Sequence, residues 1–84
     1  MAGYHLREIK RGVFGEASKI TEEHDEFIES LEQGNPVMAL VELCDLIGAI
    51  EAYALRHHNI SLESLLSMKN ATQRAFTNGS RYSK

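Results

Sequence analysis

Hydrophobic and polar positions follow a helical period soon after the N-terminal end of this chain. One apolar stripe, with spacings of seven and four, is formed by Ile20, Phe27, Ile28 and Leu31. Ser18 is a favourable N-cap for this helix, because its hydroxyl can accept a hydrogen bond from the first turn. Gly34 is typical of the position that follows a helix end, so the helix is expected to end near Gln33.

A second helix is predicted directly after this break. Asn35 at the N-cap and Pro36 at the first helical position are strong signals for a helix start. From position 37 to 50, 11 of 14 residues are apolar, which is typical of a central helix buried on nearly all sides. The helix is expected to run to about His57. Because the connection is short, the first two helices should lie antiparallel.

A third helix is expected from the N-cap Ser61 to about Thr77, where Asn78-Gly79 ends it. Its apolar face is supplied by Leu62, Leu65, Leu66 and Met68. Met68 and Met38 are interpreted as flexible residues that fill gaps in the core.

These elements predict an all-α fold, an antiparallel helical bundle, in a single domain that spans residues 1–84. Residues 1–15 lack a helical period and are expected to form a short irregular arm. The helical core is assigned to 16–79 and a polar tail to 80–84.

Composition adds that the fold is too small to be very stable alone. A chain of 84 residues buries roughly 60–65% of the surface that its unfolded form exposes. Its single cysteine, Cys44, is interpreted as a small core residue, and no disulfide within the chain is possible. We therefore expect the bundle to be completed by oligomerisation. No apolar run reaches the length of a membrane span and no signal-peptide core is seen, so a cytoplasmic protein without a membrane partner is expected.

The net charge of -3 hides an uneven distribution of charge along the chain. Ten of the 12 acidic residues lie between Glu16 and Glu51, where Lys19 is the one basic residue. Within the most apolar helix, Glu42 and Asp45 are three residues apart and therefore neighbours on one face. Two adjacent carboxylates in such a helix repel each other and need compensation.

The first helix carries a matching pair. Glu23 lies three residues after Ile20 and four before Phe27, which places it on the apolar stripe, and Glu26 lies one turn further on. Four inward carboxylates, these two with Glu42 and Asp45, would raise each other's pKa unless a cation lies among them. Oxygen ligands without histidine or thiolate favour Mg²⁺, with Mn²⁺ as an alternative, and such sites commonly bind phosphate substrates.

A plainer interpretation stays open from the residues alone. Acidic residues in the first turns of a helix are often simply solvated and favoured by the helix dipole. That default is applied to Glu22, Asp25, Glu29 and Glu32. Glu42 and Asp45 would also be solvated if their helix were only partly covered.

The spacing of these acids resembles the signature of a known family. Glu22-Glu23-x-x-Glu26 followed by Glu42-x-x-Asp45 is similar to the pattern of the MazG family of all-α nucleotide pyrophosphohydrolases. The similarity covers about residues 12–82 and is closest to the small members encoded by bacteriophages. It extends to the flanking strings Gly15-Glu16-x-Ser18-Lys19-Ile20, Leu46-Ile47-Gly48-Ala49-Ile50-Glu51-Ala52 and Thr72-x-Arg74-Ala75-Phe76-x-x-Gly79-x-Arg81.

This resemblance implies hydrolysis of a nucleoside triphosphate between its α and β phosphates, which gives the monophosphate and pyrophosphate. The implied Mg²⁺ ligands are Glu23, Glu26, Glu42 and Asp45. Glu22 completes the catalytic set as the acid that orients or deprotonates the attacking water. The resemblance also implies a homodimer or homotetramer with sites near the subunit interfaces.

Phosphate contacts are implied for Lys69 and Asn70 on the third helix, with Arg74 one turn further on. Arg74 and Arg81 are equally well interpreted as solvated charges near the C-terminal end. Lys19, four residues before Glu23, is expected either to contact phosphate or to pair with that acid.

Two other functions remain as alternatives. A non-catalytic protein on the same fold would bind a nucleotide or a protein partner without hydrolysis. A helix-turn-helix that binds nucleic acid would use the third helix, but only Lys69 and Arg74 are basic there, so no nucleic-acid partner is expected.

Overall fold

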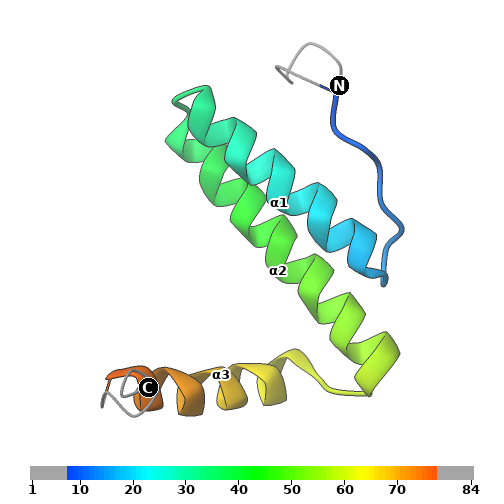
Figure 1. Ribbon diagram of the computed structural model, residues 1–84, viewed down its shortest axis with the longest axis vertical. Coiled ribbons are helices and arrows are strands. Elements are labelled where there is room, and N and C mark those ends of the chain that lie inside the picture. Colours follow the sequence, from blue (N-terminus) through cyan, green and yellow to red (C-terminus); the bar gives the residue numbers. More distant parts are fainter. Residues whose placement is uncertain (1–7, 78–84) are drawn as a thin grey trace.

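The computed structural model describes residues 8–77, with side chains for residues 8–73. The described residues form three helices and no strand, which confirms the all-α prediction (Figure 1). Within this part of the chain, no helix combines the length and the apolar character that crossing a membrane would require.

Helix α1 spans Ala17–Glu32 and begins two residues earlier than the predicted N-cap, Ser18, allows. The N-cap is Glu16, whose backbone is extended and whose side chain makes no capping hydrogen bond. The prediction that Ser18 caps this helix is therefore wrong. Its hydroxyl instead accepts a hydrogen bond from the backbone N–H of Val13 in the preceding arm, at 3.0 Å. The helix ends as predicted, with Gln33 as the C-cap and Gly34 at a positive φ of 68°.

Helix α2 spans Pro36–His58, and its start confirms the sequence signals. The side chain of Asn35 accepts a hydrogen bond from the backbone N–H of Met38 at 3.1 Å, and Pro36 occupies the first turn. At the other end, Asn59 adopts a left-handed conformation that ends the helix one residue beyond the predicted position.

Helix α3 spans Leu62–Thr77, and its predicted N-cap is confirmed by the 3.1 Å hydrogen bond from the N–H of Ser64 to the hydroxyl of Ser61. This helix leads away from the far end of α2 (Figure 1). Among the described residues it contacts α2 near their junction and does not contact α1. The apolar face predicted for it is consequently left open, with Leu66 and Met68 exposed, so the core role assigned to Met68 is wrong for the single chain.

Helices α1 and α2 lie side by side as an antiparallel pair, as predicted (Figure 1). In the described part of the chain, the fully buried hydrophobic residues are three alanines of α2: Ala39, Ala49 and Ala54. The prediction that α2 is buried nearly all round is wrong for the single chain, because among the described elements α1 alone packs along its length. The uncovered side exposes Val37, Leu40, Val41, Leu43, Cys44, Ile47 and Leu55. Cys44 is therefore not a core residue here.

Candidate metal centre

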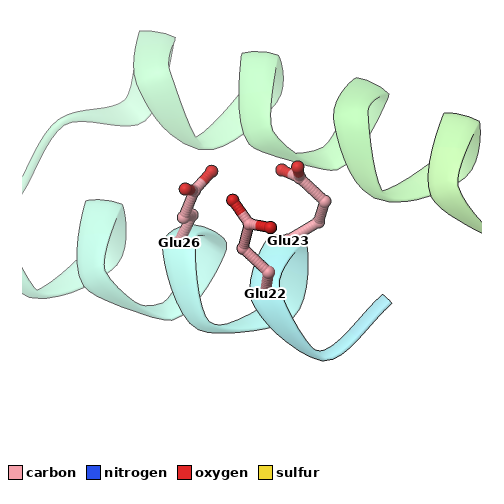
Figure 2. Close-up of side chains that lie close together, drawn as sticks. All are labelled: Glu22, Glu23 and Glu26. Atoms are coloured by element: carbon pink, nitrogen blue, oxygen red, sulfur yellow. The ribbon is translucent and has the colours of Figure 1, made fainter. Parts of the chain in front are cut away.

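Five carboxylates meet where α1 faces α2. One carboxylate oxygen from each of Glu22, Glu23 and Glu26 lies within 4.8 Å of the other two. The same is true of Glu23, Glu42 and Asp45, so Glu23 belongs to both groups and joins them. Figure 2 shows the three acids of α1, with the carboxylates of Glu23 and Glu26 extending toward α2 and that of Glu22 beside them. We call these five residues the carboxylate cluster.

Helical geometry explains why both elements deliver their acids to the same place. On α1, Glu22 and Glu23 lie four and three residues before Glu26, so all three share one side of the helix. On α2, Glu42 and Asp45 are three residues apart and share a side in the same way. The antiparallel pairing of the helices then brings the two sets into register.

Burial differs among the five acids. Glu22, Glu23 and Glu42 are only 8%, 6% and 3% exposed, whereas Glu26 is half-buried and Asp45 is exposed. The interpretation of Glu22 as a solvated residue is therefore wrong. The cluster therefore combines buried carboxylates with the half-buried Glu26 and the exposed Asp45, which solvent reaches.

Glu29 departs further from its sequence interpretation. The sequence interpretation treats Glu29 as solvated, but its exposed fraction is 1%, which makes it the most buried acid among the described residues. It lies three residues after Glu26, so the same spacing that links the other acids of α1 extends to it. Following that spacing one step beyond Glu26 would have identified Glu29 from the sequence.

The electrostatic environment shifts the pKa values of two acids of α1, Glu22 and Glu26, in opposite directions. Burial alone would raise the pKa of Glu22, but a hydrogen bond from the N–H of Gly12 and the ammonium of Lys19 outweigh it and hold this pKa below its usual value. For Glu26, burial and the negative charge of Glu23 act together and raise the pKa to about 8. At neutral pH, without a cation, Glu22 is therefore ionised while Glu26 retains its proton.

The pKa of Asp45 is shifted in the same direction as that of Glu26. Burial raises its pKa, and the charges of Glu23 and Glu42 add to the effect, while the ammonium of Lys19 opposes it. The acids of this cluster are thus short of positive charge even though one lysine lies among them.

Lys19 is placed as an ion-pair partner of the cluster. Its ammonium lies 3.1 Å from Oε1 of Glu22 and 3.1 Å from Oε2 of Glu23. Burial lowers the pKa of this lysine, but its hydrogen bonds to the two acids outweigh that effect and raise it. Of the two roles expected for Lys19, the structure shows the ion pair.

One buried oxygen of the cluster is left without a donor. Oε1 of Glu23 is inaccessible to solvent and has no hydrogen-bond partner in the described part of the chain. Oε1 of Glu42 is buried as well. Burying a carboxylate oxygen without a donor is costly, and a bound cation removes that cost. A donor set made only of carboxylate oxygens suits Mg²⁺ or Mn²⁺ and not Zn²⁺, so the residues present fit the expected metal.

The expected phosphate contacts on α3 are not brought to the cluster within one chain. Lys69 and Asn70 are exposed, and the ammonium of Lys69 donates to the side chain of Gln73 at 2.9 Å. Arg74 lies in α3, but its side chain, like the whole of Arg81, falls outside the described residues.

The sequence interpretation missed a contribution from the arm. The backbone N–H of Gly12 donates to Oε1 of Glu22 at 2.8 Å, and the charge of Arg11 also helps to lower the pKa of this acid. Backbone donors leave no residue-type pattern, so only the glycine itself was available as a signal.

A second link joins the start of α1 to the end of α2. The carboxylate of Glu16 lies 3.3 Å from Nε of Arg56 and 3.2 Å from Nε2 of His57. His57 also lies against the ring of Tyr53, with centroids 4.5 Å apart. These exposed contacts fix the ends of the two helices beside each other, on the side where the arm meets α1.

Comparison with models of known protein families, with curated protein sequences and with solved structures found no significant match.

Proposed function

We propose that this protein is a Mg²⁺-dependent nucleotide pyrophosphohydrolase, which cleaves a nucleoside triphosphate between its α and β phosphates. The observation that carries the proposal is the carboxylate cluster, in which Oε1 of Glu23 is buried and has no hydrogen-bond donor among the described residues. The similarity of the acid spacing to the MazG signature supports the same conclusion independently of the geometry.

In this proposal the metal is held by Glu23, Glu26, Glu42 and Asp45, with Mn²⁺ as a substitute for Mg²⁺. Each of these acids offers an oxygen to one of the two groups that share Glu23. The cation supplies positive charge against the phosphate oxygens and makes water more acidic. The half-buried Glu26 and the exposed Asp45 mark the side from which the triphosphate approaches.

Glu22 is the acid that orients the attacking water. It stays ionised at neutral pH because Gly12 and Lys19 donate hydrogen bonds to it. An ionised carboxylate only accepts hydrogen bonds, so the water donates an O–H to Glu22. A lone pair of the water oxygen then points away from Glu22. Glu26, with a pKa raised to about 8, gives up its proton when the cation binds.

The proposal includes a homodimer or homotetramer. Support comes from a core whose fully buried hydrophobic residues, in the described part of the chain, are three alanines, while large aliphatic side chains of α2 stay exposed. Such a core is too small to stabilise the chain alone, and a continuous exposed apolar face is typical of an interface. A second copy is the occupant that we propose for the exposed side of α2.

The proposal is tested by incubating the purified protein with a panel of ribo- and deoxyribonucleoside triphosphates and Mg²⁺, and by measuring pyrophosphate. We expect at least one triphosphate to be hydrolysed, and Glu42→Gln to lower kcat by more than about a hundredfold. Glu51→Gln is the matched control, because Glu51 is an exposed acid on the same helix and lies outside the cluster. If no triphosphate is hydrolysed, or if Glu42→Gln is as active as the control, the proposal is wrong.

One observation favours an alternative, a non-catalytic nucleotide- or protein-binding protein on the same fold. Among the described residues, Lys69 and Asn70 lie on α3, which does not contact α1 there, and the ammonium of Lys19 at the cluster is already paired with two acids. That alternative predicts tight binding of a non-hydrolysable triphosphate, or of a protein partner, with no pyrophosphate released at any Mg²⁺ concentration.

A further inference from the structure

In the described part of the arm, the backbone N–H of Gly12 reaches the carboxylate cluster. This N–H donates to Oε1 of Glu22 at 2.8 Å, across ten positions of sequence. A neighbouring hydrogen bond, from the N–H of Val13 to the hydroxyl of Ser18 at 3.0 Å, holds the same stretch of arm against the first turn of α1. The arm therefore approaches the helix as an ordered segment at this point.

Residue 12 tolerates no side chain in this position. A Cβ atom built on Gly12 would overlap the backbone carbonyl of Ser18 and the backbone nitrogen of Lys19. Both are main-chain atoms of a helical turn, so they do not move aside as a flexible side chain would. Only glycine lets the arm come close enough for its N–H to reach Glu22.

We infer that Gly12 is a positioning residue of the carboxylate cluster, whose backbone N–H fixes the direction of the Glu22 carboxylate. The inference rests on the proposed function, because it assigns a role within the same metal-dependent site. It adds a requirement that the acid motif does not contain, namely a close approach of the arm to α1.

The hydrogen bonds of Glu22 show how this positioning works. Oε1 accepts from two donors, the N–H of Gly12 and the ammonium of Lys19, the latter at 3.1 Å. A carboxylate oxygen has two lone pairs, so these donors occupy Oε1 and leave Oε2 to meet a water or a cation. Lys19 alone is a flexible point charge, whereas a backbone N–H has a fixed direction. Gly12 therefore determines which oxygen of Glu22 is available.

A second observation indicates that the cluster holds a ligand whose binding this geometry affects. Glu23, adjacent to Glu22 and 94% buried, belongs to both groups of the cluster, and its buried Oε1 has no hydrogen-bond partner in the described part of the chain. A cation held by Glu23 lies close to Glu22, because one carboxylate oxygen of each residue lies within 4.8 Å of the other. Partners that orient the carboxylates of a metal site typically change metal affinity or activity by about 10–100-fold when they are lost.

The test compares Gly12→Ala with wild type by calorimetric titration of Mn²⁺ and by kcat and KM for the best triphosphate. We expect Gly12→Ala to weaken Mn²⁺ binding or lower kcat by about 10–100-fold, with little change in the KM for nucleotide. Ser18→Ala is the matched control, since it removes the other hydrogen bond between arm and helix without creating an overlap, and we expect less than about a threefold effect. In a Glu22→Gln background, Gly12→Ala should have no further effect, because the carboxylate that it positions is gone.

A measurement on the wild-type protein covers the case in which Gly12→Ala does not fold. In a ¹H–¹⁵N NMR titration with Mg²⁺, the amide signal of Gly12 should shift in parallel with site occupancy, and that of Gly34, at the opposite end of α1, should not. If wild type binds Mn²⁺ while Gly12→Ala matches it in affinity and kcat, or if the Gly12 amide signal stays fixed as Mg²⁺ binds, this inference alone is overturned. If wild type binds no divalent cation, the proposed function fails and the inference fails with it.

Discussion

Lys19 and Glu23 form an ion pair one helical turn apart on α1, with 3.1 Å between the ammonium and Oε2 of the acid. This lysine is three-quarters buried and also contacts Glu22, so its single charge is shared between two largely buried carboxylates. Glu42 and Asp45 bring further carboxylates to the same place, together with Glu26, which keeps its proton at neutral pH until a cation replaces it. The cluster is thus partly neutralised by the chain itself, and a divalent cation supplies the positive charge that is still missing.

Replacing this lysine tests how far it compensates the cluster. Lys19→Met keeps much of the aliphatic side chain and removes the charge, so the metal-free protein should lose about 1–3 kcal/mol of unfolding free energy. Because no ammonium then opposes a cation, Mn²⁺ should raise the melting temperature of this variant more than that of wild type. Thermal unfolding with and without Mn²⁺ measures both effects. Lys69→Met, at an exposed site on α3, is the control, and an equal response of the two variants would contradict the role assigned to Lys19.

The raised pKa of Glu26 predicts a pH dependence of folding. This pKa is about 8 in the folded chain against an ordinary value of 4.5, so the folded state binds more protons than the unfolded state between these values. The stability of the metal-free protein should therefore fall as pH rises from about 4.5 to about 8, and the raised pKa of Asp45 acts in the same direction. The lowered pKa of Glu22 acts the other way and adds stability as pH rises. This gain is complete above the ordinary pKa of 4.5, so it does not reverse the fall in stability between about pH 4.5 and pH 8.

Chemical denaturation at several pH values in the presence of a chelator measures this dependence. Glu26→Gln should flatten the profile, because the amide does not titrate. Saturating Mg²⁺ should also flatten it in wild type, since the cation replaces the proton. A metal-free stability that stays constant or rises between pH 5 and pH 8 would show that Glu26 does not titrate as described.

Glu42 gives a prediction in which stability and function change in opposite directions. Its buried carboxylate repels the other acids when no metal is present, so Glu42→Gln should stabilise the metal-free protein by about 1 kcal/mol or more. The same change removes a proposed ligand, so the rise in melting temperature caused by Mn²⁺ should disappear. Glu51→Gln, at an exposed site on the same helix, should change neither the stability nor the response to Mn²⁺. If Mn²⁺ raises the melting temperature of Glu42→Gln as much as that of wild type, Glu42 is not a metal ligand.

The exposed side of α2 gives a prediction for assembly. Leu40 is 66% exposed in the single chain, and Cys44 lies one turn further along the same helix and is also exposed. If a second copy covers this side, Leu40→Glu should shift the protein from oligomer to monomer in light scattering. The Cys44 thiol should react slowly with an alkylating reagent in wild type and rapidly in the variant. A wild-type monomer whose thiol reacts as fast as that of the unfolded chain would contradict the second copy.

Local signals in the sequence were sufficient for most of the helix ends. Asn35-Pro36 and Ser61 act through hydrogen bonds and dihedral preferences within a few residues, so their effect does not depend on the rest of the fold. Ser18 failed as an N-cap because the arm offered its hydroxyl another partner, the N–H of Val13. That competition depends on where the arm lies, which no local pattern reveals.

Like the helix ends, the candidate site was partly predictable from local spacing in the sequence. Spacing along each helix is sufficient to place Glu23 and Glu42 on inward faces, because a helix fixes which residues share a side. The burial of Glu29 follows from the same period, although the family motif stops at Glu26. The hydrogen bond from Gly12 to Glu22 could not be predicted from the sequence, because it depends on a backbone N–H and a close approach rather than on a side-chain pattern.

The position of α3 shows a different limit. Its apolar period predicted a helix correctly, but not what the helix packs against, because a period states which face is apolar and not which partner covers it. In the single chain, Leu66 and Met68 stay exposed and Lys69 lies away from the acids. Its placement in an assembly depends on a second copy, whose contacts a single chain does not contain.

The measurement that tests the central claim most directly is product analysis after hydrolysis of a triphosphate in ¹⁸O-labelled water with Mg²⁺. Wild type should release the nucleoside monophosphate and pyrophosphate in equal amounts, with one ¹⁸O atom incorporated per turnover. Neither product should form with a chelator, and Glu42→Gln should form both more than about a hundredfold more slowly, whereas Glu51→Gln should match wild type. Release of orthophosphate and a nucleoside diphosphate, or no product from any triphosphate by a protein that binds Mn²⁺, would contradict a nucleotide pyrophosphohydrolase built on this carboxylate cluster.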